Sequence, residues 1–337
     1  MKTENERGGR PSLIYIEEIF YVMALPESIA GCLSLPAICA PMFAVSGPEL
    51  VREACRAGLV GAFPSKNAGD LAGLDGWLEA IRKDLRESED GPDPVGPIAV
   101  SLASSLDEEA LGAHLDVCAR RGVRIIITAA RDPTVVAKRA HDLGMLIFHD
   151  VTNMRFVEKA IAAGVDGLNC IASGGGGHSG LINPFVFVRR VRAMFSGTIV
   201  LGGAVSDGFM VRAARVLGAD LAYMGTRFIA TRESRATPEY KQALVENGLS
   251  DLMYTDKLVG VHANWLRSSM LRAGLDPQAL PEHQGRGRRH DHLPPQAVPW
   301  RTVWSAGQGM ELIQDIPSVR ELVDRLLCEY GQASRQG

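Results

Sequence analysis

Short apolar runs rich in valine and isoleucine recur along the chain from residue 37 onward, and longer amphipathic stretches separate them. Apolar runs of this length predict buried strands, and apolar positions three or four apart predict helices. The runs that we predict as strands are 37–42, 59–64, 97–102, 124–129, 146–151, 167–172, 198–203 and 221–226. They are apolar almost throughout, which is typical of strands that helices cover on both faces.

Helices fit the stretches between these strands. One begins near Ser46 and Pro48, and another runs from Asp132 to Gly144, with residues that commonly start and stop helices at these positions. Eight strand-then-helix units in succession predict a (β/α)8 TIM barrel, formed by residues 35–231 together with 314–330. An open, doubly wound sheet is the alternative, but no GxGxxG follows the first strand.

Two segments stand outside this repeat. In the N-terminal extension, residues 1–34, four apolar residues at helical spacing predict an amphipathic helix packed on the barrel or on a second subunit: Ile16, Ile19, Phe20 and Met23. A frayed extension is the alternative. Glu17 and Glu18 interrupt the same stretch and argue against a signal peptide. Residues 232–313 predict a helical insertion near the active site, with a polar loop at 283–298.

Composition narrows the class of protein. The 337 residues are 46% hydrophobic and 22% charged, with a formal net charge of −3, which is typical of a soluble globular protein. This charge balance does not predict a basic surface for binding nucleic acid. No apolar run reaches the ~18 residues that span a bilayer. The six cysteines form no CxxC pair. Neither a disulfide framework nor a zinc knuckle is therefore expected, and a reducing, cytoplasmic setting fits best.

Candidate chemistry follows the predicted strands, because the active site of such a barrel lies at their carboxyl-terminal ends. The sixth strand runs into four glycines and His178. The seventh and eighth end in LGGAVSDG and MGTR, whose small residues and Thr226 predict a phosphate site built from backbone N–H groups. His290 and His292 flank Asp291 in a polar loop that we interpret as a lid or plain loop rather than a metal site. A lone histidine beside a phosphate site suggests an organic cofactor.

Several ordered motifs between about Leu35 and Tyr330 point to a known family. The sequences PAICAPMFAVSGPELV, GLVGAFPSKNA, FHDVTNMRFVEKAIAAGVDGLN, GGHSG, GADLAYMGTRFIATRES and WSAGQGMELI resemble those of the nitronate monooxygenases, also called 2-nitropropane dioxygenases. The resemblance implies a TIM barrel that holds FMN non-covalently, with His178 as the active-site histidine and Asn67 hydrogen-bonded to the flavin. It implies that ten residues surround FMN: Ala40, Pro41, Met42, Asn67, Gly176, Gly203, Ala204, Met224, Gly225 and Thr226.

The chain departs from these relatives around the expected pocket. Many of them carry glutamine where Ile171 stands, Glu-Ala in place of residues 174–175, a second glycine in place of Ala204, and proline in place of His262. Because of these differences, the substrate of the relatives is a weaker guide to this chain than their cofactor FMN is. The residues that we expect to line the substrate pocket are His149, Ser101, Ile171 and His262, although a structural role suits His149 equally well.

The leading hypothesis is an FMN-dependent monooxygenase that oxidises alkyl nitronates, or nitroalkanes with His178 as base, with O2 to a carbonyl compound and nitrite. Three alternatives stay open. They are a biosynthetic oxidase or monooxygenase with a specialised substrate, an NAD(P)H-dependent enoyl reductase with the same kind of barrel, and a flavin- or phosphate-binding module without catalysis. The expected partners are a small-molecule substrate and O2, without nucleic acid, membrane or metal. The N-terminal helix suggests a homodimer.

Overall fold

The computed structural model describes residues 24–89, 91–283 and 290–335. At its centre eight parallel strands close into a barrel in the order β1-β2-β3-β4-β5-β6-β8-β9. The bounds of these strands are β1 Ala37–Cys39, β2 Val60–Pro64, β3 Ile98–Ser101, β4 Ile125–Ala129, β5 Leu146–Val151, β6 Gly167–Ile171, β8 Thr198–Gly202 and β9 Leu221–Met224. All eight predicted strands are present, and the predicted TIM barrel is confirmed.

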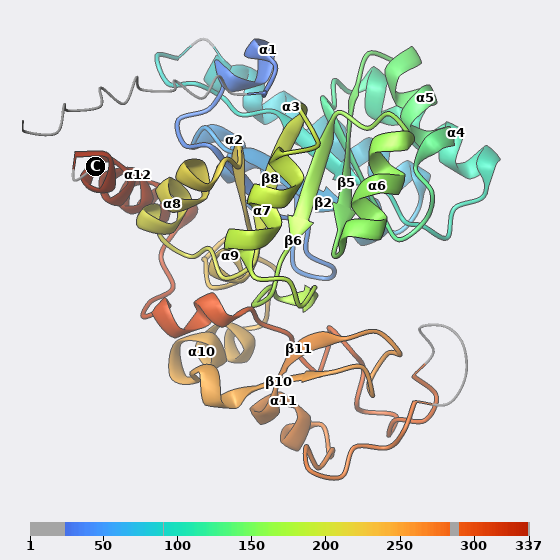
Figure 1. Cartoon of the computed structure of the whole chain (residues 1–337), viewed down its shortest axis with the longest axis vertical. Coiled ribbons are helices and arrows are strands. Elements are labelled where there is room, and N and C mark those ends of the chain that lie inside the picture. Colours follow the sequence, from blue (N-terminus) through green and yellow to red (C-terminus); the bar gives the residue numbers. More distant parts are fainter. Residues whose placement is uncertain (1–23, 90, 284–289, 336–337) are drawn as a thin grey trace, which may run out of the picture.

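Helices surround the barrel (Figure 1). Those that follow the strands are α2 Pro48–Arg56, α3 Leu71–Glu89, α4 Glu108–Arg120, α5 Thr134–Asp142, α6 Met154–Ala162, α7 Pro184–Arg192, α8 Gly208–Leu217 and the short α9 Thr226–Ile229. The last helix, α12 Val319–Arg335, packs beside α8, and the Glu329 carboxylate accepts a hydrogen bond from the Gly208 N–H at 2.8 Å. This contact ties the end of the chain to the barrel.

The period-two alternation of the strands separates two apolar layers. One buried cluster fills the barrel interior and includes Ile38, Ile127 and Phe148. A second cluster, which includes Ile147 and Val151, lies between the barrel wall and the helices. Inward and outward positions on β5 therefore alternate: 146, 148 and 150 face the interior, and 147, 149 and 151 face the helices.

The amino-terminal end of the barrel is closed by the segment that precedes β1. Leu25 and Ile29, the latter from the short helix α1 Glu27–Ala30, join the interior cluster. The Ala24 N–H donates to the Asp220 carboxylate at 3.1 Å. The amphipathic helix predicted from Ile16 to Met23 lies outside the described residues.

A smaller lobe covers the opposite end, toward which the arrow of β6 points in Figure 1. It contains α10 Pro238–Glu246, β10 Leu252–Thr255, β11 Ala263–Leu266 and α11 Arg267–Arg272, with 3-10 turns at Leu249–Asp251 and Gln308–Leu312. The strands β10 and β11 pair antiparallel and are joined by β7, Gly177–His178. The prediction of a helical insertion is therefore correct for α10 and α11 but missed this sheet.

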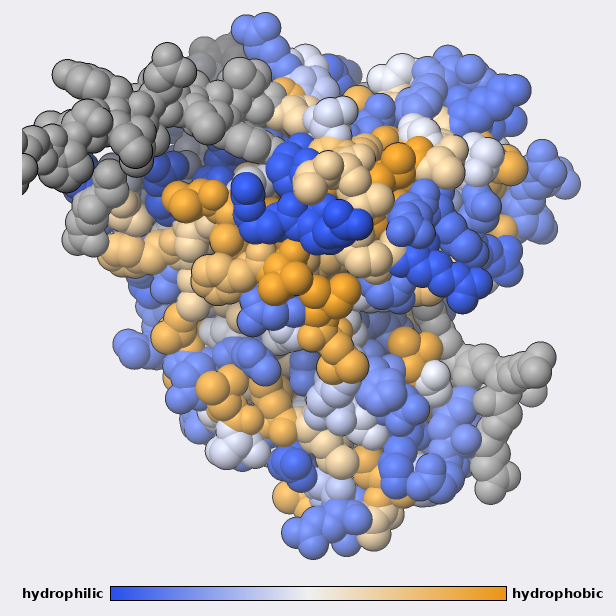
Figure 2. Space-filling view, viewed as in Figure 1, coloured by the Kyte–Doolittle hydropathy of each residue, from blue (hydrophilic) through white to orange (hydrophobic). Residues whose placement is uncertain are grey.

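The surface combines polar helix faces with apolar side chains over α7 and α8 (Figure 2). Leu181, Phe185 and Val186 are among the exposed large hydrophobic residues there, at 77%, 63% and 62% exposure. Within the described part of the chain, none of the helices combines the length and the apolar character needed to cross a lipid bilayer.

Candidate active site

His178 is held in a short strand rather than in a loose linker. His178 pairs with Ala263 of β11, and Gly177 pairs with Asn264. The Asn264 side-chain amide donates to the Gly175 carbonyl at 2.8 Å, and the Tyr254 hydroxyl donates to the Ser179 carbonyl at 3.0 Å. The lobe therefore fixes the loop that carries the histidine, and the half-buried imidazole lies between the barrel and the lobe.

One tryptophan of the lobe packs beside the histidine, and a second packs against the first. The Trp300 ring lies 5.2 Å from the His178 ring, centroid to centroid, in an edge-on arrangement, and 5.0 Å from the Trp265 ring. Trp300 has a φ of 60°, in the left-handed region that a bulky residue rarely adopts. Strained backbone of this kind concentrates at functional sites. Trp300 thus gives one side of the His178 imidazole an aromatic neighbour.

Glycines from three distant segments meet beside this loop. A Cβ on Gly176 would lie 2.9 Å from Thr226 Oγ1 and 3.0 Å from the Gly307 nitrogen. The Gly307 N–H donates to Thr226 Oγ1 at 2.9 Å, and the Gln308 N–H donates to the Gly174 carbonyl at 2.8 Å. Segment 305–309 thus forms one wall of the site. The sequence did not predict this wall, although the segment belongs to the WSAGQGMELI motif, because 80 residues separate it from the last barrel strand.

The first and last barrel strands contribute neighbouring residues. The Cβ position of Gly225 lies 3.6 Å from Met42 Sδ and 3.8 Å from Ala40 Cβ. The structure thereby brings together the APM motif after β1, with Pro41 between these two residues, and the MGT motif at the end of β9, which begins with buried Met224. The predicted cofactor residues at these two strand ends are adjacent in space.

The loop after β8 has an unusual backbone. Gly203 has a φ of 130°, and a Cβ there would lie 2.8 Å from the Ser173 carbonyl oxygen. Ala204 follows with a φ of 61°, a conformation that glycine adopts more easily. Backbone groups therefore approach one another closely at this strand end, as a phosphate-binding loop requires.

Asn67 has a structural role in the loop after β1. Its side-chain amide donates to the carbonyls of Met42 and Ser46, both at 2.9 Å, and its oxygen accepts from the Ala44 N–H at 3.0 Å. Both amide hydrogens are therefore engaged in shaping the loop after β1, where Ala44 has a φ of 62°. Asn67 therefore positions the APM loop, and its hydrogen bond to the flavin stays a prediction.

The four predicted pocket residues lie in different places. Ser101 and Ile171 occupy inward positions at the carboxyl ends of β3 and β6. His262 lies one residue before the partner of His178, stacks on Tyr254 with 5.0 Å between ring centroids, and has a 53% exposed side chain. His149 faces outward from β5, and its Nδ1 lies 2.8 Å from Thr128 Oγ1. The barrel wall therefore separates His149 from the interior, and its pocket role is not supported.

His149→Gln is expected to leave turnover and FMN binding unchanged and to alter only the acid stability. Burial lowers the pKa of His149 to about 4, so the unfolded chain binds a proton first as the pH falls below about 6.5. The folded state consequently loses stability between about pH 6.5 and about pH 4. Melting temperatures of both proteins at neutral and acidic pH test this, because the variant lacks that contribution. A large loss of turnover in the variant would return His149 to the pocket.

Three polar side chains in the barrel interior escaped the sequence analysis. Asp150, Asn169 and Tyr223 occupy inward positions of β5, β6 and β9, which are otherwise apolar. The Asn169 amide donates to the Asp150 carboxylate at 2.8 Å. Burial raises the pKa of Asp150 to about 7, although the Asn169 hydrogen bond opposes that rise. Period-two counting along the predicted strands could have shown these positions to be inward-facing.

No group of three or more His, Cys, Asp or Glu side chains that could hold a metal ion occurs in residues 24–89, 91–283 and 290–335. In the polar loop, His292 Nε2 lies 2.8 Å from the Lys257 carbonyl. This contact joins the loop to the lobe.

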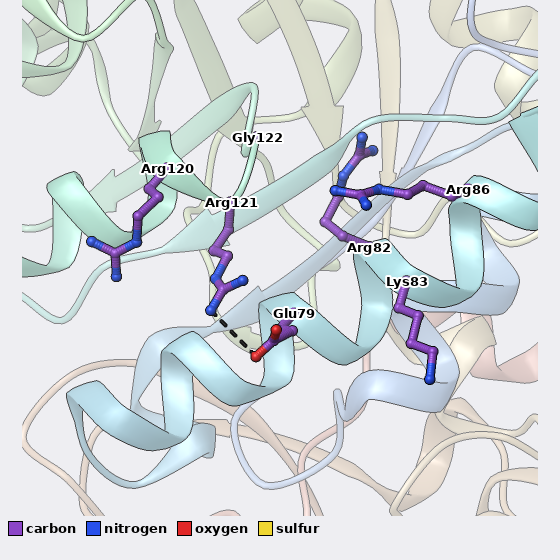
Figure 3. Close-up of a pocket in the computed structure, with 7 residues that line it drawn as sticks. All are labelled: Glu79, Arg82, Lys83, Arg86, Arg120, Arg121 and Gly122. Atoms are coloured by element: carbon purple, nitrogen blue, oxygen red, sulfur yellow. Dashed lines mark hydrogen bonds and ion pairs between the residues drawn. The ribbon is translucent and has the colours of Figure 1, made fainter.

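A separate basic hollow lies on the outer surface between α3 and α4 (Figure 3). Its lining residues are Glu79, Arg82, Lys83, Arg86, Arg120, Arg121 and Gly122. Arg121 already pairs with Asp75 at 2.8 Å and with Glu79 at 3.3 Å. The hollow adjoins the chain just before β4, at the amino-terminal end of the strands, so it is remote from His178.

Comparison with known proteins places this site in a family. The family model for nitronate monooxygenase matches residues 98–329. The chain belongs to the nitronate monooxygenase family. Members of this family are FMN-dependent oxidoreductases, which agrees with what the motifs imply for this chain.

Individual relatives are more distant. A nitronate monooxygenase from Paraburkholderia phytofirmans is 27% identical over 210 residues, which cover 57% of each protein. A Mycobacterium tuberculosis protein named (3aS,4S,5R,7aS)-5-hydroxy-7a-methyl-1-oxo-octahydro-1H-indene-4-carboxyl-CoA dehydrogenase is 25% identical over 230 residues, 67% of this chain and 61% of that protein. The chain thus spans about three fifths of the length of these relatives. A nitroalkane oxidase structure from Streptomyces ansochromogenes superposes with a TM-score of 0.75 at 21% identity, covering 92% of this chain and 99% of that one.

The residues present fit FMN. Gly176 and Gly203 leave no room for a side chain where segments 174–176, 203–206 and 305–309 meet. We call these three closely approaching segments the glycine cradle. Thr226 Oγ1 accepts a hydrogen bond from Gly307, which leaves its hydroxyl hydrogen for a phosphate oxygen. Met42 offers an apolar surface at the neighbouring strand end. A phosphate at the β8 and β9 ends with a flat ring toward β1 agrees with these features.

Proposed function

We propose that the chain oxidises alkyl nitronates, and nitroalkanes after proton removal, with O2 to a carbonyl compound and nitrite. The observation that carries this proposal is His178, fixed by β11 beside the glycine cradle with Trp300 as an aromatic neighbour. Membership of the nitronate monooxygenase family supports it. FMN, when bound, supplies the electron-transfer chemistry that links the organic substrate to O2.

His178 acts on the proton of the substrate. A nitroalkane is a carbon acid, and one imidazole nitrogen of His178 takes the α-proton, which leaves the electron-rich nitronate. With a nitronate as substrate, the protonated imidazole instead stabilises the anion. Trp300 and Trp265 restrict access of water to the ring and keep it oriented. General-base assistance of this kind contributes about 10²- to 10⁴-fold to the rate.

An aerobic assay with nitroethane and with its nitronate tests the proposal. The purified protein loaded with FMN should consume O2 and release nitrite. The nitronate is already deprotonated, so its reaction should not require a base on the protein. A protein that releases nitrite from neither compound, while its FMN is bound, would contradict the proposed reaction.

A specialised oxidoreductase reaction is the second candidate. It is favoured by the dehydrogenase from Mycobacterium tuberculosis, whose name records a bulky bicyclic carboxyl-CoA substrate. The departures at Ile171 and Ala204 lie next to the cradle and agree with an altered pocket. A screen of acyl-CoA and carboxylate compounds for reduction of the bound FMN under anaerobic conditions distinguishes the two candidates.

A further inference from the structure

A single carboxyl group occupies the wall of the barrel interior. Among the inward positions of the eight described strands, Asp150 is the one acidic residue, and none of these positions carries lysine, arginine or histidine. Asp150 as a residue is partly exposed. Its charge is therefore placed in a low-dielectric interior without a cation in the wall to balance it.

The neighbours of Asp150 hold it without neutralising it. Asn169, its register partner on β6, donates to one carboxylate oxygen at 2.8 Å. Tyr223 is the other titratable group that faces the interior, and its buried hydroxyl, like Asn169 Oδ1, has no hydrogen-bond partner among the described residues. His149 and Asp132 belong to the outer side of the wall and the loop after β4. This cluster accordingly has capacity for one more proton.

The cluster lies directly below the residues that fit FMN. Asn169 precedes Ile171 by two residues, a rise of about 7 Å along the strand. The Cβ position of Gly202 lies 3.1 Å from Ile171 Cδ1 and 3.2 Å from Tyr223 Cδ1, and Gly203 of the cradle follows at once. Asp150 is thus within electrostatic range of any charge that enters the cradle.

Adding electrons above this carboxylate changes its protonation. Burial already raises the pKa of Asp150 to about 7. Additional negative charge in the cradle favours the neutral acid further, because like charges repel strongly in a poorly solvated interior. Over the range in which the group is ionised before reduction and neutral after it, reduction must therefore be accompanied by uptake of a proton.

We propose that Asp150 is the internal proton acceptor coupled to reduction of the bound FMN. When two electrons enter from an organic reductant, the Asp150 carboxylate takes one proton from solvent and becomes a carboxylic acid. When O2 takes up the two electrons and is reduced to the peroxide level, the Asp150 acid releases that proton to the reduced oxygen or to solvent, and its carboxylate is regenerated. The inference rests on FMN as cofactor and does not depend on which organic compound is the substrate.

Redox titration of the FMN-loaded protein tests the proposal without any substrate. Dithionite and mediator dyes reduce the protein from about pH 6 to about pH 9, and visible absorption gives the midpoint potential at each pH. In wild type, the plot of midpoint potential against pH should become steeper from about pH 7 upward. The added slope should be about 30 mV per pH unit, the value for one extra proton per two electrons. Asp150→Asn should lack this steeper segment. His149→Gln, a titratable neighbour on the outer face, should retain it.

Two results would overturn the proposal: the same slope in wild type and Asp150→Asn, or a slope that changes with His149→Gln instead. If Asp150→Asn fails to bind FMN, the redox-difference infrared spectrum of wild type decides the question. Reduction above about pH 7 must then add the C=O band of a carboxylic acid, and the absence of that band contradicts the assignment. A failure of the nitronate assay leaves both measurements interpretable, since neither uses a nitronate.

Discussion

His178→Ala is expected to lower turnover by about 10²- to 10⁴-fold with nitroalkane while FMN stays bound. The imidazole is the basic side chain that β7 places beside the cradle, and its removal takes away the group proposed to accept the α-proton. FMN binding should survive, because the loop is held by backbone pairing to β11 and by the Asn264 and Tyr254 hydrogen bonds. Steady-state kinetics and the visible spectrum of the same preparation measure both quantities.

The nitronate distinguishes the role of the histidine further. A preformed nitronate needs no base, so the variant should lose less activity with nitronate than with nitroalkane. His141→Ala is the matched control, since it removes an exposed histidine on the outer helix α5 and should change turnover little. Full activity of His178→Ala with nitroethane would make His178 a loop residue without a chemical role.

Gly203→Ala is expected to weaken FMN binding by about 5- to 150-fold. The φ of 130° at Gly203 lies in a region that is essentially restricted to glycine. The new Cβ would lie 2.8 Å from the Ser173 carbonyl and 3.2 Å from the Ala172 carbonyl. Relieving this conflict requires the loop to move, at a cost of about 1–3 kcal/mol, and each 1.4 kcal/mol is about tenfold in affinity. Fluorescence titration with FMN measures the change.

The control for this variant is Gly164→Ala. Gly164 also has a left-handed φ, 77°, but nothing lies within 4 Å of its Cβ position, and it is in the turn before β6. A lowered melting temperature with unchanged FMN affinity is expected. Equal loss of affinity in both variants would mean that general destabilisation, and not the cradle, explains the effect of Gly203→Ala.

The barrel could be predicted because its strands are buried on both faces and therefore stand out as continuous apolar runs, such as RIIITA at 124–129. The lobe sheet could not, since β10 and β11 are four residues each and β7 only two. Strands this short are defined by their partners in space. The face on which a strand residue lies could have been predicted, because alternation along β5 from Phe148 puts His149 outside and Asp150 inside.

The sequence predicts backbone positions better than it predicts the hydrogen-bond partners of side chains. The glycines at 176 and 203 lie where backbone segments approach closely, and their contact with FMN stays a prediction. The motif did not show that the Asn67 amide satisfies three backbone groups of the loop after β1. Segment 305–309 was missed because contacts between distant segments leave no trace in local periodicity.

Anaerobic titration of the purified, FMN-loaded protein tests the central claim most directly. The absorbance of FMN is followed as ethylnitronate is added to one sample and NADPH to another. The proposed function predicts that nitronate bleaches the flavin and that NADPH does not, with the colour restored by O2. Rapid bleaching by NADPH, together with no response to nitronate, would contradict the proposal and favour the enoyl reductase reaction.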